Sequence, residues 1–253
     1  MAISVSSSAI EAWLQCRLRW QYEYVDKPDV RRYLSRDLTR GTVGHAALEA
    51  FYSTAPVSRT LELLRTNVLL ALDEIKSAAV DLNDGELRDL DAAAKDALAA
   101  VNAFWKIVVT DDGFVNVLTE RRVERMFDEN EFHSVLDGLI LSDDRVIIVE
   151  NKFPLSMPQA AQYITWSPQH RRYAWALALD KPVYIVYNIL TPGRFARQGP
   201  FLVPTWQQDE AADVIRRVSE DMSAGVIFPT YGFHCMRCTF RELCINRMMG
   251  GEE

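Results

Sequence analysis

The spacing of apolar residues predicts helices in the first half of the chain. Apolar positions recur at helical intervals over about 9–24 and again over 42–52. The serines just before the first of these segments are suitable helix caps. The Leu- and Ala-rich stretch 59–107 predicts two or three helices, with Gly85 as the break between them.

The second half of the chain has the pattern of a sheet. Segments 114–127, 131–141 and 145–153 read as three successive strands. The last contains a continuous apolar run, Val-Ile-Ile-Val, which is typical of a strand covered on both faces. The sequence Ser-Asp-Asp-Arg at 142–145 predicts a tight antiparallel connection between the last two strands.

A second helical and strand pattern follows. Ser167 and Pro168 are an N-cap and a first-turn proline for a helix that runs to about Leu179. A strand is expected at 182–190 and a further helix near 207–222. The order of helix, three strands, helix and strand predicts an α/β core with helical additions.

Composition narrows the class of protein. The 253 residues, 49% hydrophobic and 25% charged, suit one large domain or one domain with a sizeable insertion. No apolar run approaches the length of a membrane span, and the first residues lack the pattern of a signal peptide, so a cytosolic protein is expected. The net charge of −7 argues against non-specific coating of nucleic acid but allows a local basic groove.

Candidate chemistry lies at the ends of two predicted strands. Glu150 and Lys152 share one face of a strand, and an antiparallel hairpin would bring Asp137 beside Glu150. Two adjacent carboxylates repel unless a cation separates them, and hard oxygen ligands suit Mg²⁺ or Mn²⁺. With a lysine nearby, this set fits phosphodiester hydrolysis. The alternative is a surface salt bridge between Glu150 and Lys152.

The cysteines suggest a second metal centre. Cys235, Cys238 and Cys244 are clustered near the end of the chain, while Cys16 lies near its beginning. Four thiolates can hold structural Zn²⁺ or a [4Fe–4S] cluster. A zinc ribbon usually pairs two C-x2-C units, whereas this chain has one. His234 is an alternative ligand.

Five motifs occur in order along the chain. They are Ser-x-Ser-x-Ile with a following cysteine in 6–25, Gly41-x3-His45, Asp137 after a strand, Glu150-Asn151-Lys152, and Gln-x3-Tyr followed by the C-x2-C-x5-C tail. In this order they resemble the PD-(D/E)xK nuclease superfamily, in particular the RecB-like exonucleases with an iron–sulfur cluster. The CRISPR-associated adaptation exonucleases and the nuclease domains of AddB-type helicase–nucleases belong to that group.

The resemblance implies a fold. It is a restriction-endonuclease-like core, a central mixed sheet flanked by helices, within a single nuclease domain over 1–253. Residues 53–110 would form a helical insertion. Residues 1–25 and 226–247 would form an iron–sulfur module that clasps the two ends of the chain.

The resemblance also implies ligands and roles. His45, Asp137, Glu150 and the main-chain carbonyl of Asn151 would hold Mg²⁺ or Mn²⁺. Lys152 would orient or help to deprotonate the attacking water and stabilise the transition state. Cys16, Cys235, Cys238 and Cys244 would bind a [4Fe–4S] cluster of structural role.

Two stretches fit the glutamine–tyrosine motif. Gln169 and Tyr173 lie in the first turns of a predicted helix and share a face, so we prefer them as the pair that organises the site. Gln159 and Tyr163 are expected in a loop that touches substrate. A packing contact between helix and sheet is the alternative role for the preferred pair.

Two features depart from the family pattern or remain open. Asn151 stands where relatives often have an apolar or aromatic residue. Glu120 or Glu124, on the preceding strand, would be an additional carboxylate, although the arginines around them favour an exposed charged strand face.

The function expected from these features is exonucleolytic cleavage of DNA from its ends, with a preference for single strands. The alternatives are an endonuclease and a catalytically silent subunit that binds DNA ends in a recombination, repair or CRISPR-adaptation complex. Phe153 and Trp166 are candidates for stacking on bases. An electropositive channel would use Arg17, Arg19, Arg31, Arg32, Arg171, Arg172, Arg237 and Arg241.

Overall fold

The computed structural model of the chain describes residues 3–30, 34–79, 81–110 and 113–249. Contacts divide the chain into two compact units. The first comprises 1–33, 124–134 and 209–253, and the second comprises 34–123 and 135–208. Strands β2 (Leu118–Phe127) and β3 (Asn130–Leu141) each contribute residues to both units. The single domain predicted from the sequence stays a prediction.

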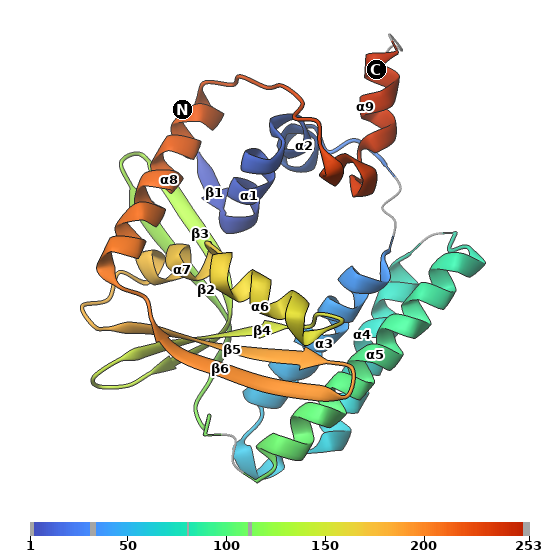
Figure 1. Cartoon of the computed structure of the whole chain (residues 1–253), viewed down its shortest axis with the longest axis vertical. Coiled ribbons are helices and arrows are strands. Elements are labelled where there is room, and N and C mark those ends of the chain that lie inside the picture. The colour runs from blue at the N-terminus through green and yellow to red at the C-terminus, as the bar shows by residue number, and fades with distance from the viewer. Residues whose placement is uncertain (1–2, 31–33, 80, 111–112, 250–253) are drawn as a thin grey trace. The chain divides into compact units, whose positions relative to one another are not determined.

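The sheet is mixed, as predicted. Its strands follow the order β1 (Ser4–Ser6), β3, β4 (Val146–Lys152), β5 (Val183–Thr191) and β6 (Arg194–Leu202), and β2 also pairs with β3. Strands β3 and β4 are antiparallel, β4 and β5 are parallel, and β5 and β6 are antiparallel (Figure 1). The α/β fold with flanking helices is therefore confirmed.

The hydrophobic pattern located the central strands better than the outer ones. Strand β4 is largely buried along its length, as its apolar run predicted. Strands β1 (Ser4–Ser6) and β6 were missed. The first has three residues, and the second is mostly polar or exposed, so neither has the apolar alternation that marks a half-buried strand.

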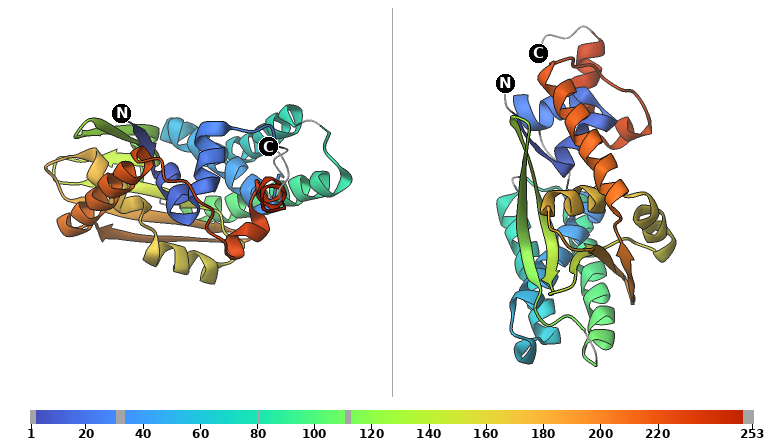
Figure 2. Two further views of the ribbon diagram at one scale, coloured as in Figure 1. Left: turned by 90° about the horizontal axis from the view of Figure 1, so that it is seen from above. Right: turned by 90° about the vertical axis from the view of Figure 1, so that its left-hand side faces the viewer.

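Three helices of the second unit pack against one another: α3 (Arg36–Ser53), α4 (Leu61–Ala78) and α5 (Asp84–Val108) (Figures 1 and 2). Helix α3 begins six residues before its predicted start because Ser35 caps it, accepting the Leu38 N–H over 3.3 Å. A short 3₁₀ turn, η2 (Pro56–Ser58), precedes α4.

The predicted break at Gly85 is wrong. Gly85 lies in the first turn of α5, and the residue that starts the helix is Asn83. The Asn83 side chain accepts the N–H groups of Gly85 and Glu86, while the Glu86 carboxylate accepts the Asn83 N–H. This capping box satisfies the first donors of the helix.

The segment between β4 and β5 forms two helices, α6 (Met157–Trp166) and α7 (Gln169–Leu177). The loop predicted at 159–163 is therefore wrong, since these residues belong to α6. Helix α7 begins one residue later than Ser167-Pro168 predicted: Pro168 occupies the N-cap, and the Ser167 hydroxyl accepts the Gln169 N–H over 3.4 Å. The helix ends two residues early, where Ala178 adopts a left-handed conformation.

The continuous helix predicted over 9–24 is also wrong. The chain forms α1 (Ser7–Gln15), α2 (Arg17–Trp20) and a π-helix, η1 (Gln21–Asp26). Cys16 separates the first two in an extended conformation, with φ −164° and ψ 114°. The predicted serine cap is confirmed: Ser6 accepts the Ala9 N–H over 3.1 Å.

Helix α2 and η1 lie beside the C-terminal segment within the first unit (Figure 1). Helix α8 (Thr205–Ser223) leads to a 3₁₀ turn, η3 (Phe233–Arg237), and to α9 (Arg241–Met248). A small core joins the N-terminal and C-terminal segments, formed by Cys16, Leu18, Tyr22 and Phe240. None of the described helices is long and apolar enough to cross a membrane.

Candidate functional site

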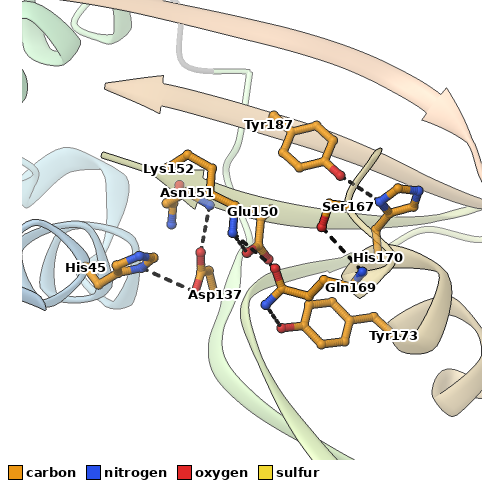
Figure 3. A network of polar contacts seen from close by, with 10 residues as sticks. All are labelled: His45, Asp137, Glu150, Asn151, Lys152, Ser167, Gln169, His170, Tyr173 and Tyr187. Atoms are coloured by element: carbon orange, nitrogen blue, oxygen red, sulfur yellow. Dashed lines mark hydrogen bonds and ion pairs between the residues drawn. The ribbon is translucent and has the colours of Figure 1, made fainter. Parts of the chain in front are cut away.

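The β3–β4 hairpin brings the two predicted carboxylates together in the second unit (Figure 3). The β3–β4 ladder ends toward the site with the pair Gly138 and Val149. One step beyond it, Asp137 Oδ2 accepts the backbone N–H of Asn151 over 2.7 Å. The carboxylate of Asp137 is thus held by the main chain of the neighbouring strand.

Glu150 is the most deeply buried acid of the site, with 4% of its surface exposed. Its Oε1 accepts from Lys152 Nζ over 2.6 Å. Its Oε2 is buried, and no hydrogen-bond partner lies among the described residues. Burial, followed by repulsion from Asp137, raises the pKa of Glu150 to about 7, although Lys152 and His45 oppose the rise.

His45 approaches the carboxylates from helix α3. Its Nδ1 lies 3.3 Å from Asp137 Oδ1, and 35% of its side chain remains exposed. Burial lowers the pKa of the imidazole, but the charge and hydrogen bond of Asp137 and the charge of Glu150 together outweigh it, so the net pKa lies above the usual value. The alternative of a histidine enclosed in the core does not fit this exposure.

Two residues that position α3 were missed in the sequence. A methyl group at Gly44 would fall 2.6 Å from Phe153 Cδ1 and Cζ, whereas nothing lies within 4 Å of such a group at Gly41. The buried Arg40 donates through Nε to the Phe153 carbonyl over 2.7 Å. The sequence feature that could have identified them is proximity to the motif: Gly44 directly precedes His45, and Arg40 directly precedes Gly41.

The preferred glutamine–tyrosine pair extends the network (Figure 3). Gln169 Oε1 accepts from Lys152 Nζ over 3.1 Å, and Gln169 Nε2 donates to the Tyr173 hydroxyl. Lys152 is therefore held between Glu150 and the first turn of α7. The side chains of Gln159 and Tyr163 lie outside the described residues.

A histidine and a tyrosine beside this network were also missed. Tyr187 on β5 lies 2.7 Å through its hydroxyl from His170 Nδ1. Burial, followed by the charge of Arg171, lowers the pKa of His170 to about 4, and burial raises the pKa of Tyr187. The imidazole is therefore neutral at pH 7, and the tautomer of the ring decides whether Tyr187 or His170 donates in this hydrogen bond.

Several predicted substrate contacts are corrected by the structure. Phe153 and Arg172 are 7% and 2% exposed, so neither side chain is available to DNA. Arg17 pairs with Asp221, and Arg19 pairs with Glu23. Arg237 and Arg241 are exposed. Arg31, Arg32 and the side chain of Trp166 lie outside the described residues.

Glu120 responds to the site electrostatically. Burial, then the charges of Asp137 and Glu49, raise its pKa. Glu124 belongs to the first unit, so the two glutamates proposed as alternatives are in different units.

Asp137, Glu150 and His45 are the candidate ligands for a divalent cation. Within the described part of the chain, no group of three or more His, Cys, Asp or Glu side chains is already arranged as a metal site. The chemistry of the set nevertheless fits Mg²⁺ or Mn²⁺. Glu150 has a buried oxygen that lacks a hydrogen-bond donor, Asp137 is adjacent, and His45 contacts Asp137.

The four cysteines line one pocket of about 130 Å³ in the first unit. All four are free thiols. Burial raises the pKa of Cys238 and Cys244, and the charges of the other cysteines raise it further, as expected of sulfurs that lie close together. The Thr230 N–H donates to Cys16 Sγ over 3.4 Å. Thiolates of this kind can bind zinc or an iron–sulfur cluster, but the four cysteines, all among the described residues, are not arranged as a ready-made metal site.

Comparison with known proteins identifies related folds. A family model described as the PD-(D/E)XK nuclease superfamily matches residues 4–245. The chain is similar to the crystal structure of a candidate exonuclease from Eubacterium rectale, with 11% identity, a TM-score of 0.59, and 98% of this chain and 93% of that chain covered. It is also similar to the structure of SSO0001, with 16% identity, a TM-score of 0.45, and 95% and 85% covered. No curated protein sequence matches.

Proposed function

The chain belongs to the PD-(D/E)XK nuclease superfamily, and from this premise we propose that it is a divalent-metal-dependent exonuclease that degrades DNA from its ends and prefers single strands. One observation carries the proposal. Asp137, Glu150 and Lys152 converge, and the buried Glu150 Oε2 lacks a hydrogen-bond donor. A buried carboxylate oxygen of this kind is costly unless a cation completes its environment.

The side chains divide the work of hydrolysis. Asp137, Glu150 and His45, with the Asn151 carbonyl, would hold Mg²⁺ or Mn²⁺. The bound cation would supply positive charge to the scissile phosphate and make water more acidic. Lys152 Nζ is held by Glu150 and Gln169 and would supply a second positive charge to stabilise the negative charge that develops on the phosphate. Tyr173 holds Gln169 in place, since Gln169 Nε2 donates to its hydroxyl.

The test uses end-labelled linear DNA with Mg²⁺ or Mn²⁺. Wild-type protein should release labelled nucleotides from linear single strands, and Lys152→Ala should lose this activity by about 10²–10³-fold. Lys181→Ala is the matched control: this exposed lysine donates to the Ser142 carbonyl and takes no part in the proposed site. Equal degradation by wild type and Lys152→Ala would refute the assignment.

Two further substrates separate the alternatives. Circular single-stranded DNA should resist the protein, because it has no end, and its cleavage would indicate an endonuclease. Binding of DNA ends without cleavage in either metal would indicate the silent subunit. Matched linear single and double strands then test the strand preference.

For the cysteine pocket we propose a structural [4Fe–4S] cluster bound by Cys16, Cys235, Cys238 and Cys244. The position of all four cysteines in the lining of one pocket supports it. Protein purified without oxygen should be brown, with a broad absorbance band near about 400 nm, and should contain iron and sulfide. Colourless protein with stoichiometric zinc would assign the site to Zn²⁺ instead. The resemblance also makes proteins of recombination or CRISPR adaptation the proposed partners.

A further inference from the structure

A series of hydrogen-bonded polar side chains begins at the middle residue of the Glu-x-Lys motif. Asn151 and Asn188 are 3% and 0% exposed and stand opposite each other in the β4–β5 ladder. Asn188 Nδ2 donates to Asn151 Oδ1 over 2.9 Å. Arg197 Nε donates to Asn188 Oδ1 over 2.9 Å, and Arg197 Nη2 donates to the Tyr52 hydroxyl over 3.2 Å. This series of hydrogen bonds thus connects strand β4 to helix α3.

The direction of each hydrogen bond follows from the chemistry of arginine. A guanidinium has donors only, so the Asn188 atom that faces it must be the oxygen. The Asn188 amide nitrogen then faces Asn151, whose oxygen must accept. The orientation of both asparagines is therefore determined by Arg197.

This series of side-chain contacts closes into a ring through the candidate active site. Tyr52 and His45 are seven residues apart on α3, which places them on the same side of the helix. His45 contacts Asp137, and Asp137 accepts the Asn151 N–H. Every link lies within the second unit.

We propose that Arg197 is a positioning residue: through this ring it fixes the helix that carries His45 against the strand that carries Glu150. The proposal rests on the proposed function for the cation that these side chains would hold. It also gives a physical reason for the asparagine at position 151, because an apolar residue there would leave Asn188 without its acceptor.

Arginine suits this position better than lysine. Its planar fork donates from Nε and Nη2 to two different acceptors, and its flat face lies 3.9 Å from the centre of the Phe114 ring. A lysine would keep the charge but could not reproduce both directed hydrogen bonds. Arg197→Lys therefore separates a role of the fork from a role of the charge.

The first experiment needs no metal. Hydrogen exchange of the Asn151 backbone N–H, measured by NMR on the full-length protein without added divalent cations, reports on the hydrogen bond from this N–H to Asp137. Arg197→Met should accelerate this exchange at least about five-fold, the equivalent of one lost hydrogen bond. Tyr52→Phe removes a single hydroxyl and should act in the same direction even where Arg197→Met folds poorly. The amide of Val101, in the core of α5, should be unchanged.

The second experiment measures Mn²⁺ binding by calorimetry. Arg197→Met and Arg197→Lys should both weaken binding about ten-fold, in the range of changes to residues that support metal ligands. Arg194→Met is the matched control, an exposed arginine of the same strand. A merely structural role would lower the melting temperature of the Arg197 variants without changing their Mn²⁺ affinity.

The outcomes distinguish the two proposals. Unchanged Asn151 exchange in both Arg197→Met and Tyr52→Phe would overturn the positioning role, as would full rescue of Mn²⁺ affinity by Arg197→Lys. Failure of the wild-type chain to bind Mn²⁺ or cleave DNA would overturn the proposed function, and the exchange experiment would still decide the role of Arg197.

Discussion

The carboxylate site and the cysteine pocket both gather residues from distant parts of the chain, but by different means. Asp137 and Glu150 lie on adjacent strands of a sheet, and hydrogen bonds hold their side chains in place. The cysteines come from an extended residue between two short helices and from a segment whose only regular elements are a 3₁₀ turn and the eight-residue helix α9. The two carboxylates are therefore held in place by the sheet and its hydrogen bonds without a ligand.

The carboxylate site lies beside a much larger buried core than the cysteine pocket does. The core beside the carboxylate site includes Leu48, Phe51 and Phe104, all almost completely buried. Around the cysteines the buried core is small, and Phe233 and Met236 are 93% and 70% exposed. A segment with so little apolar burial gains little stability from packing. The comparison therefore agrees with the proposal that catalysis lies in the region with the larger core, and that a group bound by the thiols would stabilise the other region.

The largest expected effect separates chemistry from stability. Asp137→Asn keeps an oxygen that can accept the Asn151 N–H but removes a negative charge, so nuclease activity should fall about 10²–10³-fold. The melting temperature should change little. Asp143→Asn, an exposed acid in the hairpin turn, is the control. Retained activity in Asp137→Asn would remove this residue from the candidate ligands.

The second effect is on stability. Cys238→Ser should abolish the visible absorbance and lower the free energy of unfolding by on the order of 3 kcal/mol, because the cluster would act as a cross-link over a very long loop. Exchange of the Asn151 amide in the folded protein should stay slow. Met236→Ser, an exposed residue between two of the cysteines, is the control in urea unfolding. Equal loss of protection at Asn151 and around the cysteines would contradict the contrast between the two regions.

A paired glycine substitution probes the rigidity of the carboxylate site. Gly44→Ala places a methyl group against the Phe153 ring and should destabilise the protein by about 1–3 kcal/mol, while displacing His45 and lowering activity. Gly41→Ala, on the same helix with open space around it, should be neutral or stabilise by up to about 1 kcal/mol. Unfolding in urea and nuclease assays of both variants would check this, and equal effects would argue against the close packing of α3.

The smallest expected effect is on pH dependence. The pKa of His170 is about 4 in the folded protein and 6.5 in an unperturbed histidine, so the unfolded chain takes up the proton first as the pH falls. Its contribution to stability is complete above pH 6.5 and is lost progressively toward pH 4. NMR titration of the ring should give the low midpoint, and His170→Gln should have a flatter dependence of unfolding free energy on pH in this window. An ordinary midpoint near 6.5 would contradict the effect of burial on the His170 ring.

Elements with a strong local signal could be predicted from the sequence. The continuous apolar run of β4 and the helical spacing of α4 and α5 reflect burial that each segment requires by itself. The helix break at Cys16 could not be predicted in this way. It depends on distant partners: the Leu18 N–H donates to the Phe228 carbonyl over 3.2 Å, and Cys16 Sγ accepts the Thr230 N–H.

The sequence by itself determined the chemical types and their order: a histidine, an aspartate, the Glu-x-Lys motif and four cysteines. The alternation of side chains along a strand was enough to place Glu150 and Lys152 on one face. Only the tertiary structure decided which arginines are available, because Arg172 is buried by packing and Arg17 is paired with a residue about two hundred positions away. It also decided the partners of Asn151, since hydrogen bonds between strands and helices depend on register and packing, which local sequence patterns do not encode.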